Sequence, residues 1–149
     1  LYNRFKLDEP WDSPHNRELL GLMPAIYRCP SDDTMGEGMT GYLSFRGPGA
    51  ILDRPGGTRL AEITDGTSNT IMVLESMKAV EWARPLDFNV GEDAEVPLDQ
   101  IGSKHPNGFN DLFADGSVRF LQNTLDPQIL KALITRNGGE IINPNGLLP

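Results

Sequence analysis

The stretch from Ser103 to Leu121, SKHPNGFNDLFADGSVRFL, fixes the local fold of this 149-residue chain. The pair Asp115-Gly116 lies between two runs of alternating apolar residues, which is the strongest short-range sequence signal for a β-hairpin. A two-residue type I′ turn needs positive φ at both central positions, and glycine and aspartate accept that conformation better than most residues. The stretch therefore predicts two antiparallel strands joined by a turn at Asp115-Gly116.

A two-residue loop also predicts which side chains share a face of the hairpin. Phe113 would face Val118, and Asp111 would face Phe120. The apolar face would then consist of Phe109, Phe113, Val118 and Phe120. Asp111 would lie among these side chains, where a carboxylate without a partner is costly to bury. We expect Asp111 at a partly exposed edge of the sheet. The alternatives are a longer loop, or a functional Asp111 paired with an arginine or a metal.

The composition indicates one domain, residues 1–149, with an acidic surface. The chain has 13 Lys and Arg residues against 21 Asp and Glu residues, which gives a net charge of −8. Such a charge disfavours nucleic acid and anionic membrane surfaces as partners and favours cations. The acidity concentrates between Asp87 and Asp99, a segment without Lys or Arg, and most such runs are solvated loops.

Cys29 is the only cysteine, so no disulfide can form within the chain and a Cys-x-x-Cys zinc motif is excluded. It precedes Pro30 and has no histidine near it in the sequence. A reactive cysteine needs a setting that favours the thiolate. We therefore expect a small buried side chain at this position rather than a nucleophile.

The order of the expected elements is that of an α+β domain with a mainly antiparallel, loop-rich sheet and a C-terminal helix packed on it. We expect a helix over residues 14–23 that Ser13 or Asp12 caps. A central strand is expected over residues 71–75, which are hydrophobic on both faces. A second helix should begin at Asp126-Pro127, end at Gly138 and precede a short strand over residues 140–142. Its core-facing stripe would be Ile129, Leu130, Leu133 and Ile134.

An oxygen-rich loop precedes the central strand. Asp65, Thr67 and Asn69 alternate as hard oxygen ligands around a glycine, which suits Ca²⁺. The loop lacks the further acids and the bidentate glutamate of an EF-hand. The alternative is that these side chains bond to their own backbone in Asx- and Ser/Thr-turns. Glu75, further along the strand, could complete either network.

His105, with Asp111, Asp115 and the acidic loop upstream, forms a second polar group. Imidazole and carboxylate are standard partners in metal sites and in general-base catalysis. The alternative is that His105 shapes the turn that enters the hairpin and bonds locally. The chain carries no nucleophile elbow, His-Glu-x-x-His motif or phosphate loop.

Two tryptophans, Trp11 and Trp82, are candidates for a ligand site. Together they could form a platform for a sugar ring. Isolated tryptophans are more often part of a core or of a groove wall. A sugar platform therefore needs both rings on one surface.

The motifs resemble those of the bacterial H-X9-DG family, a domain family of unknown function. The matching segments, which follow the same order along most of the chain, are Tyr27 to Asp32, Arg59 to Thr70, Glu75, Trp82 to Pro85, and His105 to Leu121. Within the last segment, His105, Asp111, Asp115 and Gly116 are the signature positions. The resemblance brings no catalytic residue with it.

The resemblance implies a pseudopilin-like protein related to type II secretion. An N-terminal helix with a prepilin-type cleavage and methylation signal would anchor it in the inner membrane, and a head would project into the periplasm or outside the cell. Such a helix is not among residues 1–149, so we interpret the chain as the C-terminal portion of a longer protein. Its partners would be other pseudopilins or envelope proteins. Some family descriptions carry a solute-binding label, and related secretion pseudopilins hold Ca²⁺ in their heads.

Three functional hypotheses follow. The first is a structural or interaction head domain of a pseudopilin-like envelope protein, without catalysis. The second is a module that binds a solute or glycan in a groove formed by Trp11, Trp82 and the acidic loop. The third is a hydrolase that uses His105 and Asp115.

Overall fold

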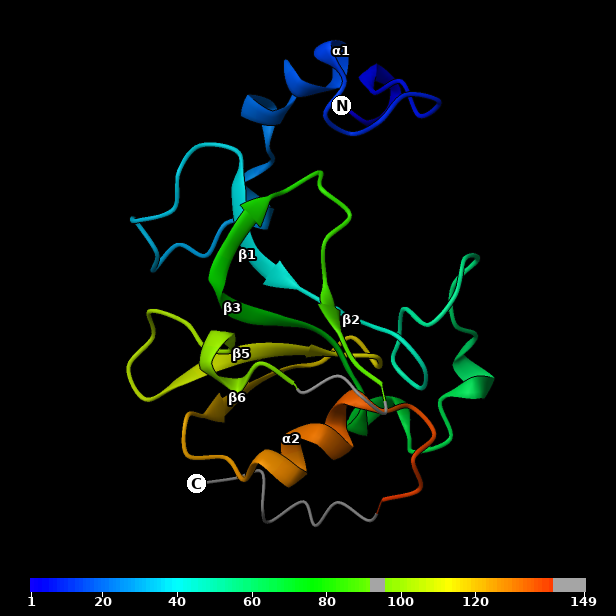
Figure 1. The fold of residues 1–149 in the computed structure, drawn as a ribbon. Helices are drawn as coiled ribbons and strands as arrows, with labels where there is room; N and C mark the ends of the chain where they lie inside the picture. The colour runs from blue at the N-terminus through cyan, green and yellow to red at the C-terminus, as the bar shows by residue number, and fades with distance from the viewer. Residues whose placement is uncertain (92–95, 141–149) are drawn as a thin grey trace.

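The computed structural model describes residues 1–91 and 96–140, which form an α+β fold (Figure 1). The main sheet is antiparallel and has the strand order β1-β3-β5-β6. Its strands are β1 Met39–Leu43, β3 Ile71–Glu81, β5 Gly108–Phe113 and β6 Val118–Gln122. A second, parallel sheet pairs β2 Phe45–Arg46 with β4 Phe88–Asn89. The predicted α+β class with a mainly antiparallel sheet is confirmed.

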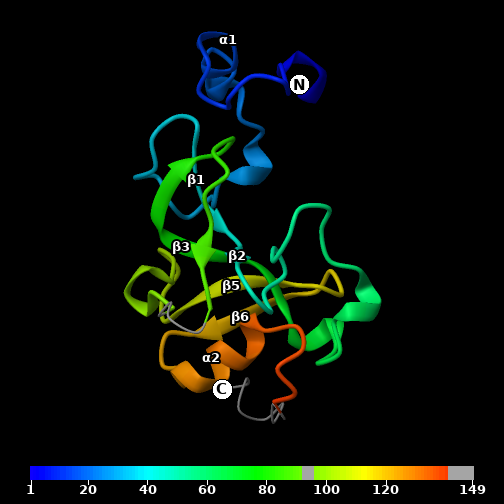
Figure 2. The same cartoon turned by 45° about the vertical axis from the view of Figure 1, so that its right-hand side comes forward.

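The two α-helices of the described residues are α1 Pro14–Arg17 and α2 Pro127–Ile134. Short 3-10 helices connect the other elements: η1 Tyr2–Arg4, η2 Leu20–Leu22, η3 Ala25–Tyr27, η4 Leu60–Glu62, η5 Thr67–Asn69 and η6 Leu98–Gln100. The view in Figure 2 agrees with Figure 1 that the N-terminal segment and α2 lie at opposite ends of the molecule, with the main sheet between them.

The C-terminal helix begins where the sequence predicts. The Asp126 side chain accepts a hydrogen bond of 2.8 Å from the backbone N–H of Gln128, which is a capping bond. The helix ends at Ile134 rather than near Gly138, because Thr135 already has an extended backbone. Of the strand predicted over residues 140–142, only residue 140 is among the described residues. Residues 92–95 of the acidic segment also lie outside them.

The helix predicted over residues 14–23 is shorter than expected. Ser13 caps it as predicted, with its Oγ 3.2 Å from the backbone N of Asn16, but the α-helix ends at Arg17. Asn16 is buried, and its amide donates hydrogen bonds to the backbone oxygens of Lys6 and Pro10. These tertiary bonds hold the helix against the preceding loop, and the chain continues as the separate 3-10 helix η2.

The hairpin of β5 and β6 has a three-residue loop instead of the predicted two-residue turn. The backbone N–H of Phe113 donates to the oxygen of Ser117, and that of Gly116 donates to the oxygen of Phe113, both at 2.9 Å. Gly116 has a φ of 85°, whereas Asp115 is not among the residues with positive φ. This is a type I turn followed by a left-handed residue, the common three-residue hairpin loop.

The extra loop residue shifts the strand register by one and exchanges the two faces of β6. Phe109 pairs with Leu121, and Asp111 pairs with Arg119. Leu121 is therefore buried, whereas Val118 and Phe120 are 65% and 46% exposed. The predicted apolar face was correct for β5 and wrong for β6, because a slip of one residue moves every side chain of a strand to the other face.

The core lies on one face of the main sheet, between the sheet and α2 (Figure 1). Its largest fully buried apolar side chains are Phe45, Phe113, Ile71, Leu74, Leu121, Leu133 and Ile134. The predicted central strand extends six residues beyond Glu75 and lies inside the sheet. Neighbouring residues of a strand point to opposite faces, so Glu75 points away from the face that Leu74 occupies. The face that carries Glu75 holds the candidate site.

Candidate functional site

Three polar side chains from distant parts of the sequence converge on the face of the sheet opposite the core. Cys29 Sγ lies 3.5 Å from His105 Nε2, and the same nitrogen lies 3.3 Å from Glu75 Oε1. All three ligand-type atoms lie within 4.8 Å of one another. Cys29 and Glu75 are each 4% exposed, and His105 is half-buried.

The loop that follows η3 positions Cys29. The backbone N–H of Asp32 donates to the oxygen of Cys29 at 3.1 Å, which closes a turn around Pro30. On either side of the cysteine, the Arg28 guanidinium donates to the backbone oxygen of Met35, and Thr40 Oγ1 donates to that of Tyr27 at 2.7 Å. The thiol is thereby held against strand β3.

Hydrogen bonds from β5 orient Glu75. Its Oε2 accepts from the backbone N–H of Asn110 at 2.7 Å and from the side-chain amide of Asn110 at 3.2 Å. These bonds occupy one carboxylate oxygen and leave Oε1 next to His105. Among the described residues the carboxylate has no Lys or Arg within ion-pair distance, and the ion-pair contact that it does make is with His105.

The loop before β5 places His105. Its backbone N–H donates to Ser103 Oγ at 3.0 Å, and that hydroxyl donates to the oxygen of Gly108 at 2.9 Å. The imidazole meets the ring of Phe120 edge-on, with a centroid distance of 6.5 Å. The expectation that His105 shapes the entry to the hairpin holds for its backbone. Its imidazole, however, reaches Cys29 and Glu75 instead of bonding locally.

Burial and negative charge keep a proton on the thiol. Burial raises the pKa of Cys29, and a hydrogen bond with Glu75 raises it further. Burial also raises the pKa of the neighbouring Tyr42 to about 12, with smaller contributions from Cys29 and Glu75. A nucleophilic cysteine needs the opposite shift. The surroundings of Cys29 therefore match the predicted buried cysteine rather than an activated nucleophile.

The arrangement differs from a Cys-His-acid relay. In such a relay the cysteine and the acid bond to different nitrogens of the imidazole. Here Cys29 Sγ and Glu75 Oε1 both approach Nε2 of His105. The three side chains therefore point their donor atoms at one shared position, which is the arrangement of ligands around a cation.

Asp111 lies in the core, which corrects the expectation of a partly exposed edge position. It is 0% exposed, and neither carboxylate oxygen has a hydrogen-bond partner among the described residues. Burial raises its pKa to about 8, and the negative charge of Glu75 adds to the shift. Its cross-strand neighbour Arg119 does not pair with it, since the guanidinium lies over the Phe113 ring at 4.3 Å from the centroid.

Asp115 lies in the exposed turn of the hairpin, at the opposite end of β5 from His105. Its Oδ1 accepts from the backbone N–H and the hydroxyl of Ser117 at 2.9 and 2.6 Å, and these bonds lower its pKa. Strand β5 spans six residues, and at about 3.4 Å per residue its two ends lie about 17 Å apart. The structure does not bring the predicted pair of His105 and Asp115 together.

The oxygen-rich loop bonds to backbone groups. Asp65 accepts from the N–H groups of Gly138 and Gly139 at 2.7 and 3.0 Å, and the Asn69 amide donates to the backbone oxygen of Asp65 at 3.0 Å. The loop thus ties the start of β3 to the segment after α2. Glu75 belongs to the Cys29 and His105 cluster instead. Calcium binding by Asp65, Thr67 and Asn69 stays a prediction.

The two tryptophans lie in different surroundings. Trp82 stacks on Tyr27 with a centroid distance of 5.5 Å, meets Phe5 edge-on at 5.7 Å, and donates from Nε1 to the backbone oxygen of Leu20. It lines a hollow of about 380 Å³ near the N-terminus, and Trp11 is not among the lining residues. Trp11 instead lies beneath the Arg84 guanidinium, 5.7 Å from the ring centroid.

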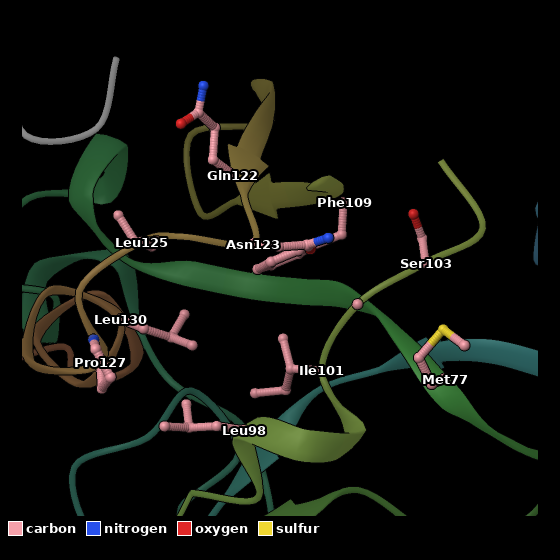
Figure 3. Close-up of a pocket in the computed structure, with 11 residues that line it drawn as sticks. Met77, Leu98, Ile101, Ser103, Phe109, Gln122, Asn123, Leu125, Pro127 and Leu130 are labelled. Atoms are coloured by element: carbon pink, nitrogen blue, oxygen red, sulfur yellow. The ribbon is translucent and has the colours of Figure 1, made fainter. Parts of the chain in front are cut away.

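A groove of about 420 Å³ lies between η6, one end of the hairpin and the start of α2 (Figure 3). Leu98 and Ile101, from η6 and the residue after it, and Leu130, from α2, line it, as Figure 3 shows. Gln122 and Asn123, at the end of β6, are polar residues of its lining. Its lining does not include the three residues of the cluster.

Comparisons with family models, with curated proteins and with solved structures find no match to this chain. Within residues 1–91 and 96–140, none of the helices has the length and apolar character needed to cross a membrane.

Sequence reasoning missed the convergence of Cys29, Glu75 and His105. Cys29 and His105 are 76 residues apart, so no short spacing pattern connects them. One signal was present: each of the three lies in a different segment of the family resemblance. Glu75 was also an acidic residue in a strand predicted to be central and therefore in need of a polar partner.

Proposed function

We propose that this chain is the head domain of a pseudopilin-like envelope protein that acts through contacts with other envelope proteins and carries out no reaction. The observation that carries the proposal is an uneven distribution of exposed apolar side chains. Within the described residues, those of the first 27 positions are Leu1, Tyr2, Leu7, Leu22, Ile26 and Tyr27. Tyr2 and Ile26 are 72% and 79% exposed. Clustered exposed apolar groups mark surfaces that a partner covers.

The position of this segment supports the proposal. It lies at the end of the molecule farthest from α2 (Figures 1 and 2). A membrane helix joined to Leu1 would place this end nearest to neighbouring subunits of a pseudopilus and would direct the sheet and α2 away from the membrane. The family resemblance and the shared-nitrogen geometry of the cluster, which does not fit a relay, favour the same assignment.

Site-specific photocross-linking in bacterial cells that express the full-length protein tests this function. With the cross-linking amino acid at Ile26, we expect covalent adducts with other envelope proteins or with second copies of the protein. The matched control is Leu60, which is also an exposed apolar residue, at 69%, but lies outside the N-terminal segment. Equal yields at the two positions, or a full-length sequence without a prepilin-type segment before Leu1, would contradict the proposal.

A second candidate function, binding of a small solute, is favoured by the groove in Figure 3. An apolar wall with a few amide groups is typical of small-molecule sites, and a volume of about 420 Å³ is within their usual range. We expect Leu98→Trp, which fills the groove from its rim, to abolish any calorimetric binding signal found with a panel of sugars and metabolites. Leu60→Trp is the matched control. Flat titrations of the unmodified protein across the panel would count against this function.

A further inference from the structure

We propose that Cys29 Sγ, Glu75 Oε1 and His105 Nε2 form a binding site for one zinc ion. This site goes beyond the proposed interaction function and does not depend on it. A thiolate, an imidazole and a carboxylate are all common ligands of Zn²⁺. The sulfur and the imidazole nitrogen select a borderline-soft transition metal over Ca²⁺ and Mg²⁺, which prefer oxygen ligands alone.

The distances between the ligand atoms support a tetrahedral ion. With bonds of about 2.3 Å to sulfur and about 2.05 Å to nitrogen and oxygen, a tetrahedral angle places S and N about 3.6 Å apart and N and O about 3.3 Å apart. The corresponding distances are 3.5 Å between Cys29 Sγ and His105 Nε2 and 3.3 Å between His105 Nε2 and Glu75 Oε1. For the third pair, Cys29 Sγ and one carboxylate oxygen of Glu75 lie within 4.8 Å of each other.

The surrounding residues orient the ligands in the way that metal sites require. Asn110 occupies Oε2 of Glu75 with two hydrogen bonds, so Oε1 remains for the ion. The Ser103 hydroxyl, which bonds to the backbone of Gly108 and of His105, holds the loop that carries His105. Outer hydrogen bonds of this kind fix the ligands of metal sites and affect metal affinity.

Space for one water molecule lies beside two of the three ligands, Cys29 and Glu75. A small cavity of about 10 Å³ adjoins the site and is lined by Cys29, Glu75, Tyr42 and Lys104 among others. That volume is close to the minimum that holds one water molecule. Three protein ligands and one water complete a tetrahedral shell.

Zinc binding also accounts for the charges of the site. Among the described residues no Lys or Arg lies within ion-pair distance of the Glu75 carboxylate. The ion forms a bond to sulfur as the S–H bond breaks, and the proton leaves to solvent, so one proton is released for each thiol bound. The two positive charges of the ion then balance the thiolate and the Glu75 carboxylate.

The competing explanation is a hydrogen-bonded group in which His105 bonds to Cys29 or Glu75 without an ion. The two explanations differ in how the purified protein of residues 1–149 responds to added metal. Chelator-treated protein is titrated with Zn²⁺ in competition with a chromophoric chelator. We expect a stoichiometry of one ion per chain, a rise in melting temperature, and a sulfur-to-cobalt charge-transfer band when Co²⁺ replaces Zn²⁺.

The variants His105→Gln and Cys29→Ser should weaken zinc affinity by about 100-fold or more, since each removes a direct ligand. The Cys29→Ser variant should also lose the charge-transfer band with Co²⁺. The matched control is His15→Gln, which removes the only other histidine, an exposed residue, and should leave affinity unchanged. Circular dichroism checks that the variants fold. Absence of stoichiometric binding to the unmodified protein, or affinity that survives in both ligand variants, would overturn the proposal.

Discussion

The free energy of unfolding is expected to fall by about 3 kcal/mol between pH 5 and pH 7, and Asp111→Asn should remove most of this fall. The cause is the position of Asp111 in the core, where its carboxyl group is fully buried and has no hydrogen-bond partner among the described residues. Burial and the charge of Glu75 raise its pKa from 3.8 to about 8. We therefore expect Asp111 to hold its proton in the folded protein at neutral pH.

The sign follows from the proton balance. Between the unfolded pKa of 3.8 and the folded pKa of about 8, the folded state holds a proton that the unfolded state has released. Unfolding then releases a proton, so higher pH favours the unfolded state by about 1.4 kcal/mol per pH unit. The stabilising effect of this proton is complete below the unfolded pKa and is lost as the pH rises through the folded pKa.

Urea unfolding curves across pH 4 to 9, in a chelating buffer that keeps the Glu75 site free of metal, measure this dependence. Asparagine keeps the shape of the protonated acid and cannot ionise, so Asp111→Asn should give a flat profile from pH 5 to 8 and should exceed the unmodified protein in stability at pH 8. The control is Asp115→Asn in the exposed turn of the same hairpin. In this variant the free energy of unfolding should fall with pH as steeply as in the unmodified protein. A stability that rises with pH over this range would show that Asp111 is ionised and paired, with Arg119 as the nearest candidate on β6.

The hairpin shows which parts of the fold the sequence could predict. Its location and the position of Gly116 follow from local turn chemistry, and both were predicted. Its register depends on one loop residue, because the strand period is two and a shift of one exchanges the faces. That single residue places Asp111 opposite Arg119 instead of Phe120, and leaves Phe120 exposed beside His105.

The two helices show the same division between local and tertiary effects. The start of α2 depends on Asp126 and Pro127 alone, and it was predicted to the residue. The length of α1 depends on where the Asn16 amide finds its partners, which are residues of a loop that no local pattern relates to it. The local capping of a helix could be predicted from the sequence, whereas the long-range hydrogen bonds of Asn16 could not.

The candidate site was the least predictable part. Cys29 was correctly expected to be buried, but its contact with His105 spans 76 positions of the sequence and arises only once β1, β3 and β5 pair. The sequence argument joined His105 to acids close to it along the chain, Asp111, Asp115 and the acidic loop upstream. The sheet instead provides Glu75, which β3 places beside β5 through the bonds from Asn110.

Gly47→Ala is expected to destabilise the fold by about 4 kcal/mol or more, a loss that is exceptional for one methyl group. Gly47 follows β2 and has a φ of 131°, which side-chain-bearing residues rarely adopt. A Cβ at this position would lie 1.9 Å from the backbone oxygen of Val90 and 3.0 Å from its carbonyl carbon. The chain after β4 is held there by a 2.8 Å hydrogen bond from the Val90 N–H to the oxygen of Arg46, so relief of the clash must disrupt the small parallel sheet.

The matched control is Gly116→Ala, in which φ is also positive, at 85°, but no atom lies within 4 Å of the added Cβ. The free energy of unfolding of this variant should fall by only about 1 to 2 kcal/mol, which is the conformational cost of a left-handed alanine. Urea unfolding of both variants separates the clash from the backbone cost, and failure of Gly47→Ala to yield folded protein agrees with the expected direction. Equal losses for the two variants would mean that β2 and β4 separate easily. The parallel sheet would then contribute little to the core that Phe45 and Phe88 share, although their rings lie 5.9 Å apart.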